Sequence, residues 1–124
     1  MRVLICDDVP ELRALARLAL ESDVDFSVVG EAADAREAVR AVGAQRPDVV
    51  VLDLAMPGAD GLQGIEWIRR AAPETGIVIF SAFGAGGVRD RALALGADFF
   101  VEKGQPLGEL RAAVRGAGLS RQAS

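Results

Sequence analysis

Five polar residues in this sequence stand directly after, or at the end of, short apolar runs. They are Asp7, Asp8, Asp53, Ser81 and Lys103. If the runs are neighbouring parallel strands, these side chains meet at the edge of the sheet where such folds place their ligand sites. Each residue alone is ordinary at a strand end, as a helix cap or turn former. Three acids, a hydroxyl and a lysine together predict a site with chemistry of its own.

The three aspartates limit what that chemistry can be. Carboxylates about 4 Å apart repel one another by roughly 4 kcal/mol per pair at an effective dielectric constant of 20. A divalent cation such as Mg2+ offsets this repulsion, because it takes oxygen ligands and leaves places for water and phosphate oxygens. The ammonium group of Lys103 can pair first with a carboxylate and later with a phosphoryl group. The residues therefore predict phosphoryl chemistry assisted by Mg2+.

The site requires strands that end together, and the sequence pattern supplies them. Short apolar runs predict strands over residues 3–6, 26–29, 49–52, 77–80 and 99–101. Three of these runs are apolar throughout, which is typical of strands covered on both faces of a parallel sheet.

Amphipathic segments between these runs predict helices over residues 10–21, 34–45, 61–72, 88–95 and 106–116. Asp34 and Glu37 form a capping box at the start of the second helix, and Pro47 follows its end. Gly96 fits a cap after the fourth helix. Five strand–helix repeats predict an α/β fold with a doubly wound parallel sheet and right-handed crossovers.

Length and composition narrow the class of protein. The chain has 124 residues, enough for one domain, and 51% of them are hydrophobic. Its net charge is -4, and the excess of acid lies in the first 60 residues, which hold 12 Asp and Glu against 6 Arg. With no basic stripe we expect no direct nucleic-acid binding, and with one cysteine and no long apolar segment we expect a cytoplasmic, non-membrane protein. Lys103 is the single lysine beside 13 arginines, and the chain has no histidine.

Four motifs resemble the receiver domain of two-component response regulators over residues 2–117. They are Leu4-Ile5-Cys6-Asp7-Asp8, Val51-Leu52-Asp53-Leu54-Ala55-Met56-Pro57-Gly58-Ala59-Asp60-Gly61, Phe80-Ser81-Ala82 and Gly96-Ala97-Asp98-Phe99-Phe100-Val101-Glu102-Lys103. The resemblance implies a flavodoxin-like, five-stranded parallel sheet of order 2-1-3-4-5 with five helices in three layers.

The same resemblance implies the site roles. Asp53 would accept a phosphoryl group, and Lys103 and Ser81 would bind the oxygens of that group. The Mg2+ ligands would be Asp8, Asp53 and the backbone carbonyl of Ala55, with Asp7 acting mainly through water. A carboxylate nucleophile needs no general base, which agrees with a chain that lacks histidine.

The resemblance further implies a signalling switch. Phosphate at the strand ends would draw Ser81 inward, Phe100 would rotate into the vacated space, and the face made by the fourth helix, fifth strand and fifth helix would change. The phosphoryl group would come from a sensor histidine kinase or a phosphotransfer protein. A homodimer formed on phosphorylation is a further partner state that the resemblance allows.

The segment after Lys103 departs from most receivers, where proline follows the lysine directly. Here Gly104 and Gln105 precede Pro106, and this arrangement is more similar to the subfamily with a LuxR-type helix-turn-helix output domain. We therefore expect a missing C-terminal output domain and a role in transcription regulation. Three glycines among residues 84–87 predict a mobile segment.

Two alternatives to the switch remain at this point. One is a Mg2+-dependent phosphohydrolase with an aspartyl nucleophile, although Ala55 stands where such enzymes place a second acid. The other is a constitutive interaction module of the same fold. We expect no turnover enzyme beyond weak autophosphatase activity, with the receiver domain over residues 1–117 and a tail or linker start over residues 118–124.

Overall fold

The computed structural model describes residues 1–55, 61–82 and 87–122. Its strands are β1 (Arg2–Cys6), β2 (Ser27–Ala32), β3 (Val49–Leu52), β4 (Gly76–Ser81) and β5 (Phe99–Glu102). Its helices are α1 (Pro10–Glu21), α2 (Ala35–Gln45), α3 (Gly61–Ala71), α4 (Val88–Ala94) and α5 (Leu107–Gln122). Strands and helices alternate along the chain, as the apolar pattern predicts.

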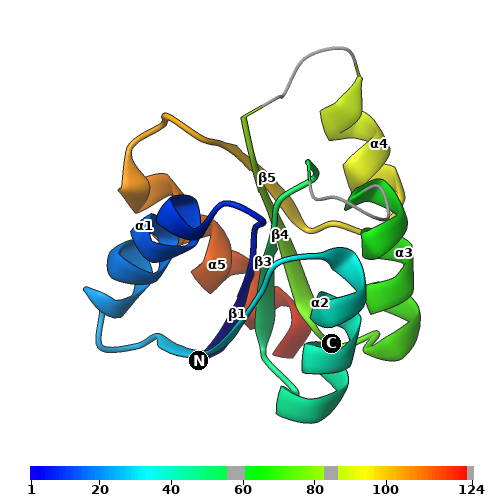
Figure 1. Cartoon of the computed structure of the whole chain (residues 1–124), viewed down its shortest axis with the longest axis horizontal. Helices are drawn as coiled ribbons and strands as arrows, with labels where there is room; N and C mark the ends of the chain where they lie inside the picture. Colours follow the sequence, from blue (N-terminus) through cyan, green and yellow to red (C-terminus); the bar gives the residue numbers. More distant parts are fainter. Residues whose placement is uncertain (56–60, 83–86, 123–124) are drawn as a thin grey trace.

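The strands form a parallel sheet in the order β2-β1-β3-β4-β5. Figure 1 shows α1 and α5 on one face of this sheet and α2, α3 and α4 on the other. This is the predicted three-layer α/β sandwich of order 2-1-3-4-5, and the fold prediction is confirmed. The order reverses between β1 and β3, so their carboxyl ends flank the point where such sheets hold ligands.

Alternate strand residues fill two separate cores. In β1, Val3 and Ile5 join the core under α1 and α5, whereas Leu4 and Cys6 join the core under α2, α3 and α4. The strands β1, β3 and β4 are buried on both faces, which explains why their sequences are apolar without alternation. Burial also raises the pKa of the Cys6 thiol, which packs as a small apolar side chain.

The helix ends follow the predicted signals. The carboxylate of Asp34 accepts a hydrogen bond from the Glu37 amide at 2.8 Å, which caps the start of α2. After the end of α2, Arg46 adopts a left-handed conformation with φ 47° and Pro47 follows. Gly96 follows the end of α4 with φ 117°, a conformation that favours glycine.

The last helix is longer than predicted. It continues six residues past 116, to Gln122, so residues 118–122 of the predicted tail or linker start are helical. Ala117 is fully buried beneath the sheet, and Arg121 forms an ion pair with Asp98 at 2.8 Å, which holds the final turn against the start of β5. Small and polar residues suggested a linker because these tertiary contacts are invisible in the sequence. The boundary of the domain itself stays a prediction.

Two smaller points concern the loops and the second strand. The strand β2 starts one residue later than predicted and extends to Ala32, because it pairs with β1 along its length. Most of the glycine-rich segment predicted to be mobile, residues 83–86, lies outside the described residues.

Gly61 at the start of α3 permits a close approach that no other residue type allows. A Cβ atom at this position would stand 2.4 Å from the Cα and 2.6 Å from the carbonyl oxygen of Leu54. We expect Gly61→Ala to lower the free energy of unfolding by about 2 kcal/mol, measured by urea denaturation.

Gly43 within α2 provides the matched control for this prediction. A Cβ atom there would meet nothing within 4 Å, so Gly43→Ala should raise stability by about 1 kcal/mol through helix propensity alone. Equal stability of the two variants would show that the backbone at Leu54 moves away from the new Cβ atom at position 61 without cost.

Candidate functional site

The backbone brings the predicted site residues to one edge of the sheet. Asp7 and Asp8 follow β1, Asp53 follows β3, Ser81 ends β4 and Lys103 follows β5. Hydrogen bonds tie these ends together, from the Asp53 amide to the Cys6 carbonyl at 2.9 Å and from the Lys103 amide to the Ser81 carbonyl at 2.8 Å. The side chains therefore converge because neighbouring strands end at the same level.

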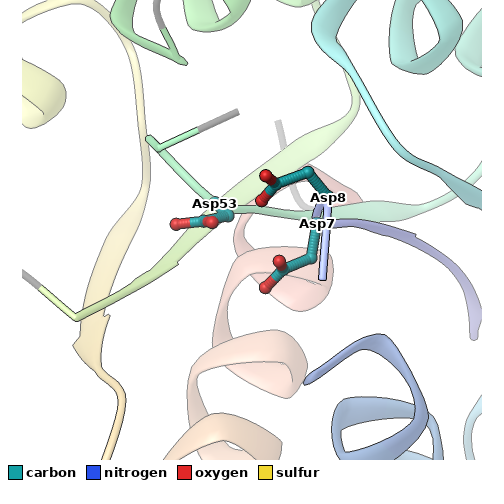
Figure 2. A group of neighbouring side chains, drawn as sticks. All are labelled: Asp7, Asp8 and Asp53. Atoms are coloured by element: carbon teal, nitrogen blue, oxygen red, sulfur yellow. The ribbon is translucent and has the colours of Figure 1, made fainter. Parts of the chain in front are cut away.

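The three aspartates form one acidic cluster. One carboxylate oxygen from each of Asp7, Asp8 and Asp53 lies within 4.8 Å of the other two. Figure 2 shows the three side chains at the ends of β1 and β3, with the carboxylates of Asp7 and Asp8 extending toward the side where Asp53 lies. Asp7 and Asp53 are both 4% exposed, whereas Asp8 is more accessible. Oxygen donors in this number and spacing fit a hard divalent cation such as Mg2+.

Lys103 supplies the positive charge of the cluster. Its Nζ atom lies 2.6 Å from Asp7 Oδ2 and 3.4 Å from Asp53 Oδ2. The same ammonium lies 5.8 Å from the centroid of the Phe80 ring. The side chain is 13% exposed, so its charge acts in a poorly solvated place where an ion pair is screened little. The single lysine of the chain thus joins two of the three acids.

Burial changes the acidity of Asp53. It raises the pKa of the Asp53 carboxyl, and the charge of Asp7 raises it further. Lys103 and the hydrogen bond from the Ala55 amide act against this shift by stabilising the carboxylate. Since the net pKa shift is upward, the Asp53 carboxyl group is more costly to ionise in the folded chain than in water.

Three further predicted residues lie where expected. Ser81 is 1% exposed at the end of β4. Ala55 is exposed, and its amide donates to Asp53 Oδ1 at 3.3 Å. Phe100 in β5 is half-buried and packs against the core under α2, α3 and α4. These contacts thus join Asp7, Asp8, Asp53, Ala55 and Lys103, and Ser81 ends the strand beside them, while the individual roles of these residues stay predictions.

The sequence reasoning missed Arg13 and Glu31. Arg13 Nη1 donates to the Asp7 carbonyl oxygen at 2.6 Å, and Arg13 Nε donates to Glu31 Oε1 at 3.0 Å. Arg13 belongs to α1 and Glu31 to β2, so no local spacing links them to the acidic cluster. Arg13 could have been singled out only as an arginine five residues after an acid pair.

Comparison with known proteins decides the family. The family model for the response regulator receiver domain matches residues 3–115. The chain belongs to this family. Receiver domains are phosphorylation-dependent switches of two-component signalling, so the predicted function is confirmed at this level. They generally bind Mg2+ at an acidic pocket and receive phosphate from a histidine kinase or phosphotransfer partner.

Similar proteins carry different names. A protein-glutamate methylesterase/protein-glutamine glutaminase of Agrobacterium fabrum is 37% identical, and the match covers 99% of this chain and 37% of that protein. A two-component response regulator of the LuxR family from Aurantimonas sp. SI85-9A1 is 33% identical, with 97% of this chain and 86% of that chain covered and a TM-score of 0.91.

A third similar structure is a complex. It is a CheX-CheY-BeF3-Mg+2 complex from Borrelia burgdorferi, which is 26% identical, with 94% of this chain and 87% of that chain covered and a TM-score of 0.87. The receiver domain described here spans about a third of the methylesterases that it matches. Across the described ranges, each helix is too short or too polar to cross a membrane.

The raised pKa of Asp53 yields a stability prediction. Asp53→Asn keeps the shape of the side chain and removes a poorly solvated charge from the acidic cluster. Without divalent cations at pH 7, we expect the variant to be more stable by about 1 kcal/mol, or a few degrees in Tm, measured by thermal unfolding. Ionisation of Asp53 is easier in the unfolded chain, so the wild type loses stability as pH rises through the folded pKa of Asp53.

The advantage of the variant should therefore shrink as the pH falls toward 3.8, the ordinary pKa of this group. Asp25→Asn serves as a control that should change little, because the Asp25 side chain is 72% exposed. A less stable Asp53→Asn protein at pH 7 would mean that attraction to Lys103 outweighs the cost of burial.

Proposed function

We propose that Asp53 is the phosphoacceptor of this receiver domain. An Asp53 carboxylate oxygen attacks the phosphorus atom of a phosphohistidine on a sensor histidine kinase or phosphotransfer protein. A P–O bond forms, the P–N bond breaks, and its electron pair returns to the imidazole nitrogen. The burial of Asp53 at the end of the central strand, with the Asp7 and Asp8 carboxylates extending toward its side of the cluster, supports this assignment.

Asp7, Asp8, Asp53 and the carbonyl of Ala55 would hold Mg2+ at this site. The bound ion would neutralise negative charge on the acids and on the incoming phosphoryl oxygens. Support comes from the spacing of the carboxylate oxygens within 4.8 Å and from the similar Borrelia complex with BeF3 and Mg2+. Asp8, the more accessible of the pair, is suited to direct ligation, and Asp7 to contact through water.

Lys103 and Ser81 complete the machinery in this proposal. The Lys103 ammonium shifts from the Asp7 carboxylate to a phosphoryl oxygen, because the new group brings about two negative charges to the pocket. The Ser81 hydroxyl donates to a second phosphoryl oxygen from the end of β4. An ionised Asp53 has no proton to lose, so the transfer proceeds without a general base.

Phosphorylation then shifts a two-state surface. Movement of Ser81 toward the phosphoryl group leaves space for the Phe100 ring, which is half-buried on the neighbouring strand. The face formed by α4, β5 and α5 changes with it, and this face controls an output domain, a partner or a homodimer. Only a difference in interaction energy between the two states can drive this shift.

Two outputs have specific support. The segment from Glu102 to Pro106 and the similarity to the Aurantimonas LuxR-family regulator favour a DNA-binding output and transcription regulation. The similarity to the Agrobacterium methylesterase favours an enzymatic output instead. We favour the first because of the segment from Glu102 to Pro106, and we expect this regulator to act in the cytoplasm.

A phosphorylation assay separates the receiver from its alternatives. With acetyl phosphate and Mg2+, we expect one phosphoryl group per chain, detected by intact mass, and none in Asp53→Asn. Beryllofluoride should form a Mg2+-dependent complex with the wild type alone. Turnover of many substrate equivalents would instead identify a phosphohydrolase, and the absence of any adduct would identify a constitutive interaction module.

The compact ammonium of Lys103 provides another prediction. Lys103→Arg keeps the net charge, but the planar guanidinium does not fit a place where one nitrogen lies 2.6 Å from Asp7 and 3.4 Å from Asp53. We expect the initial rate of phosphorylation at saturating Mg2+ to fall at least about tenfold. A rate equal to the wild type would show that charge alone matters.

A further inference from the structure

Asp7 has a hydrogen-bond partner at each of its four polar atoms. Its amide donates to the Ala32 carbonyl at 3.0 Å, and its carbonyl accepts from Arg13 Nη1 at 2.6 Å. Its Oδ1 atom accepts from the Val9 amide at 3.0 Å, and its Oδ2 atom accepts from Lys103 Nζ at 2.6 Å. The aspartate is therefore fixed from β2, from α1 and from the end of β5 at once.

The contact from Arg13 differs from the others because of the peptide that it reaches. The Asp7 carbonyl belongs to the peptide that joins Asp7 to Asp8, so fixing this plane orients the side chains of both acids. It lies in the β1–α1 turn, where no strand partner holds the chain in this direction. A donor from α1 thus contacts the peptide that links the two acids.

Arg13 is itself held in place by Glu31. The Glu31 carboxylate accepts from Arg13 Nε at 3.0 Å through Oε1 and from Arg17 Nε at 2.9 Å through Oε2. Glu31 immediately precedes Ala32, whose carbonyl receives the Asp7 amide. The end of β2 therefore contacts Asp7 in two ways. The Ala32 carbonyl accepts from its amide, and Glu31 holds the Arg13 side chain that donates to its carbonyl.

We propose that Arg13, oriented by Glu31, is a positioning residue that sets the affinity of the acid pair for Mg2+. This inference rests on the proposed function, in which the acidic cluster holds the ion. A positive charge beside the cluster would by itself weaken Mg2+ binding, but Glu31 neutralises that charge locally. The contribution of Arg13 is therefore geometric. Its planar guanidinium is a fork whose Nη1 atom reaches Asp7 while its Nε atom reaches Glu31.

Two substitutions of Arg13 separate geometry from charge. Arg13→Lys keeps the positive charge but loses the fork, and Arg13→Gln loses both. We expect the Kd for Mg2+, measured by isothermal titration calorimetry on the full chain, to rise about tenfold in both variants. Arg17→Gln is the matched control, because Arg17 shares Glu31 but makes no contact with Asp7 among the described residues; its Kd should stay near the wild-type value.

A second readout excludes a merely structural role. At saturating Mg2+, the phosphorylation rate of Arg13→Lys with acetyl phosphate should return to about the wild-type rate, since only the affinity for the ion is reduced. In an Asp7→Asn background, Arg13→Gln should cause a smaller further rise in Kd, because one of the acids that it orients is already neutral.

The possible failures are distinguishable. A wild-type Kd for Mg2+ in Arg13→Lys would overturn the positioning role while leaving the receiver function intact. The same would follow if Arg17→Gln lost as much Mg2+ affinity as the Arg13 variants. A wild-type chain that shows no binding of Mg2+ and no adduct at Asp53 would overturn the proposed function, and this inference with it. Urea unfolding of each variant confirms that the compared chains are folded.

Discussion

Three carboxylates held together at a poorly solvated edge of a sheet are the constraint on which the functional site depends. Their mutual repulsion and the burial of Asp53 work against folding, and Lys103 offsets part of this cost through contacts at 2.6 and 3.4 Å. Such a cluster persists because the two cores beneath it are well packed. The unfavourable charge is then available as binding energy for a cation and for a group that the cation accompanies.

The sheet makes this concentration of charge possible. Burial on both faces of β1, β3 and β4 fixes the level at which each strand ends, and backbone hydrogen bonds join neighbouring ends. The acids project from a rigid edge, and Ser81 and Lys103 project from the strands beside them. Precision of this kind is more easily obtained on strand ends of a packed sheet than on mobile loops.

Arginine and lysine have separate roles in this molecule. Arginines with fork-shaped contacts fix the backbone, as Arg13 does at Asp7 and Arg69 does at the carbonyls of Thr75 and Gly96. The one lysine lies beside Asp7 and Asp53, where it brings a compact charge on a flexible stem. These arginines therefore hold backbone segments, whereas the lysine pairs with the acidic cluster.

The sequence by itself determined the alternation of strands and helices, the two-faced burial of three strands and the meeting of five polar residues at one edge, because these follow from periodicity and from chain order. Only the tertiary structure decided that α5 continues to Gln122 and that Arg13, paired with Glu31, contacts the Asp7 carbonyl. Both depend on contacts between residues far apart in the chain, such as Arg121 with Asp98, and local patterns carry no record of them.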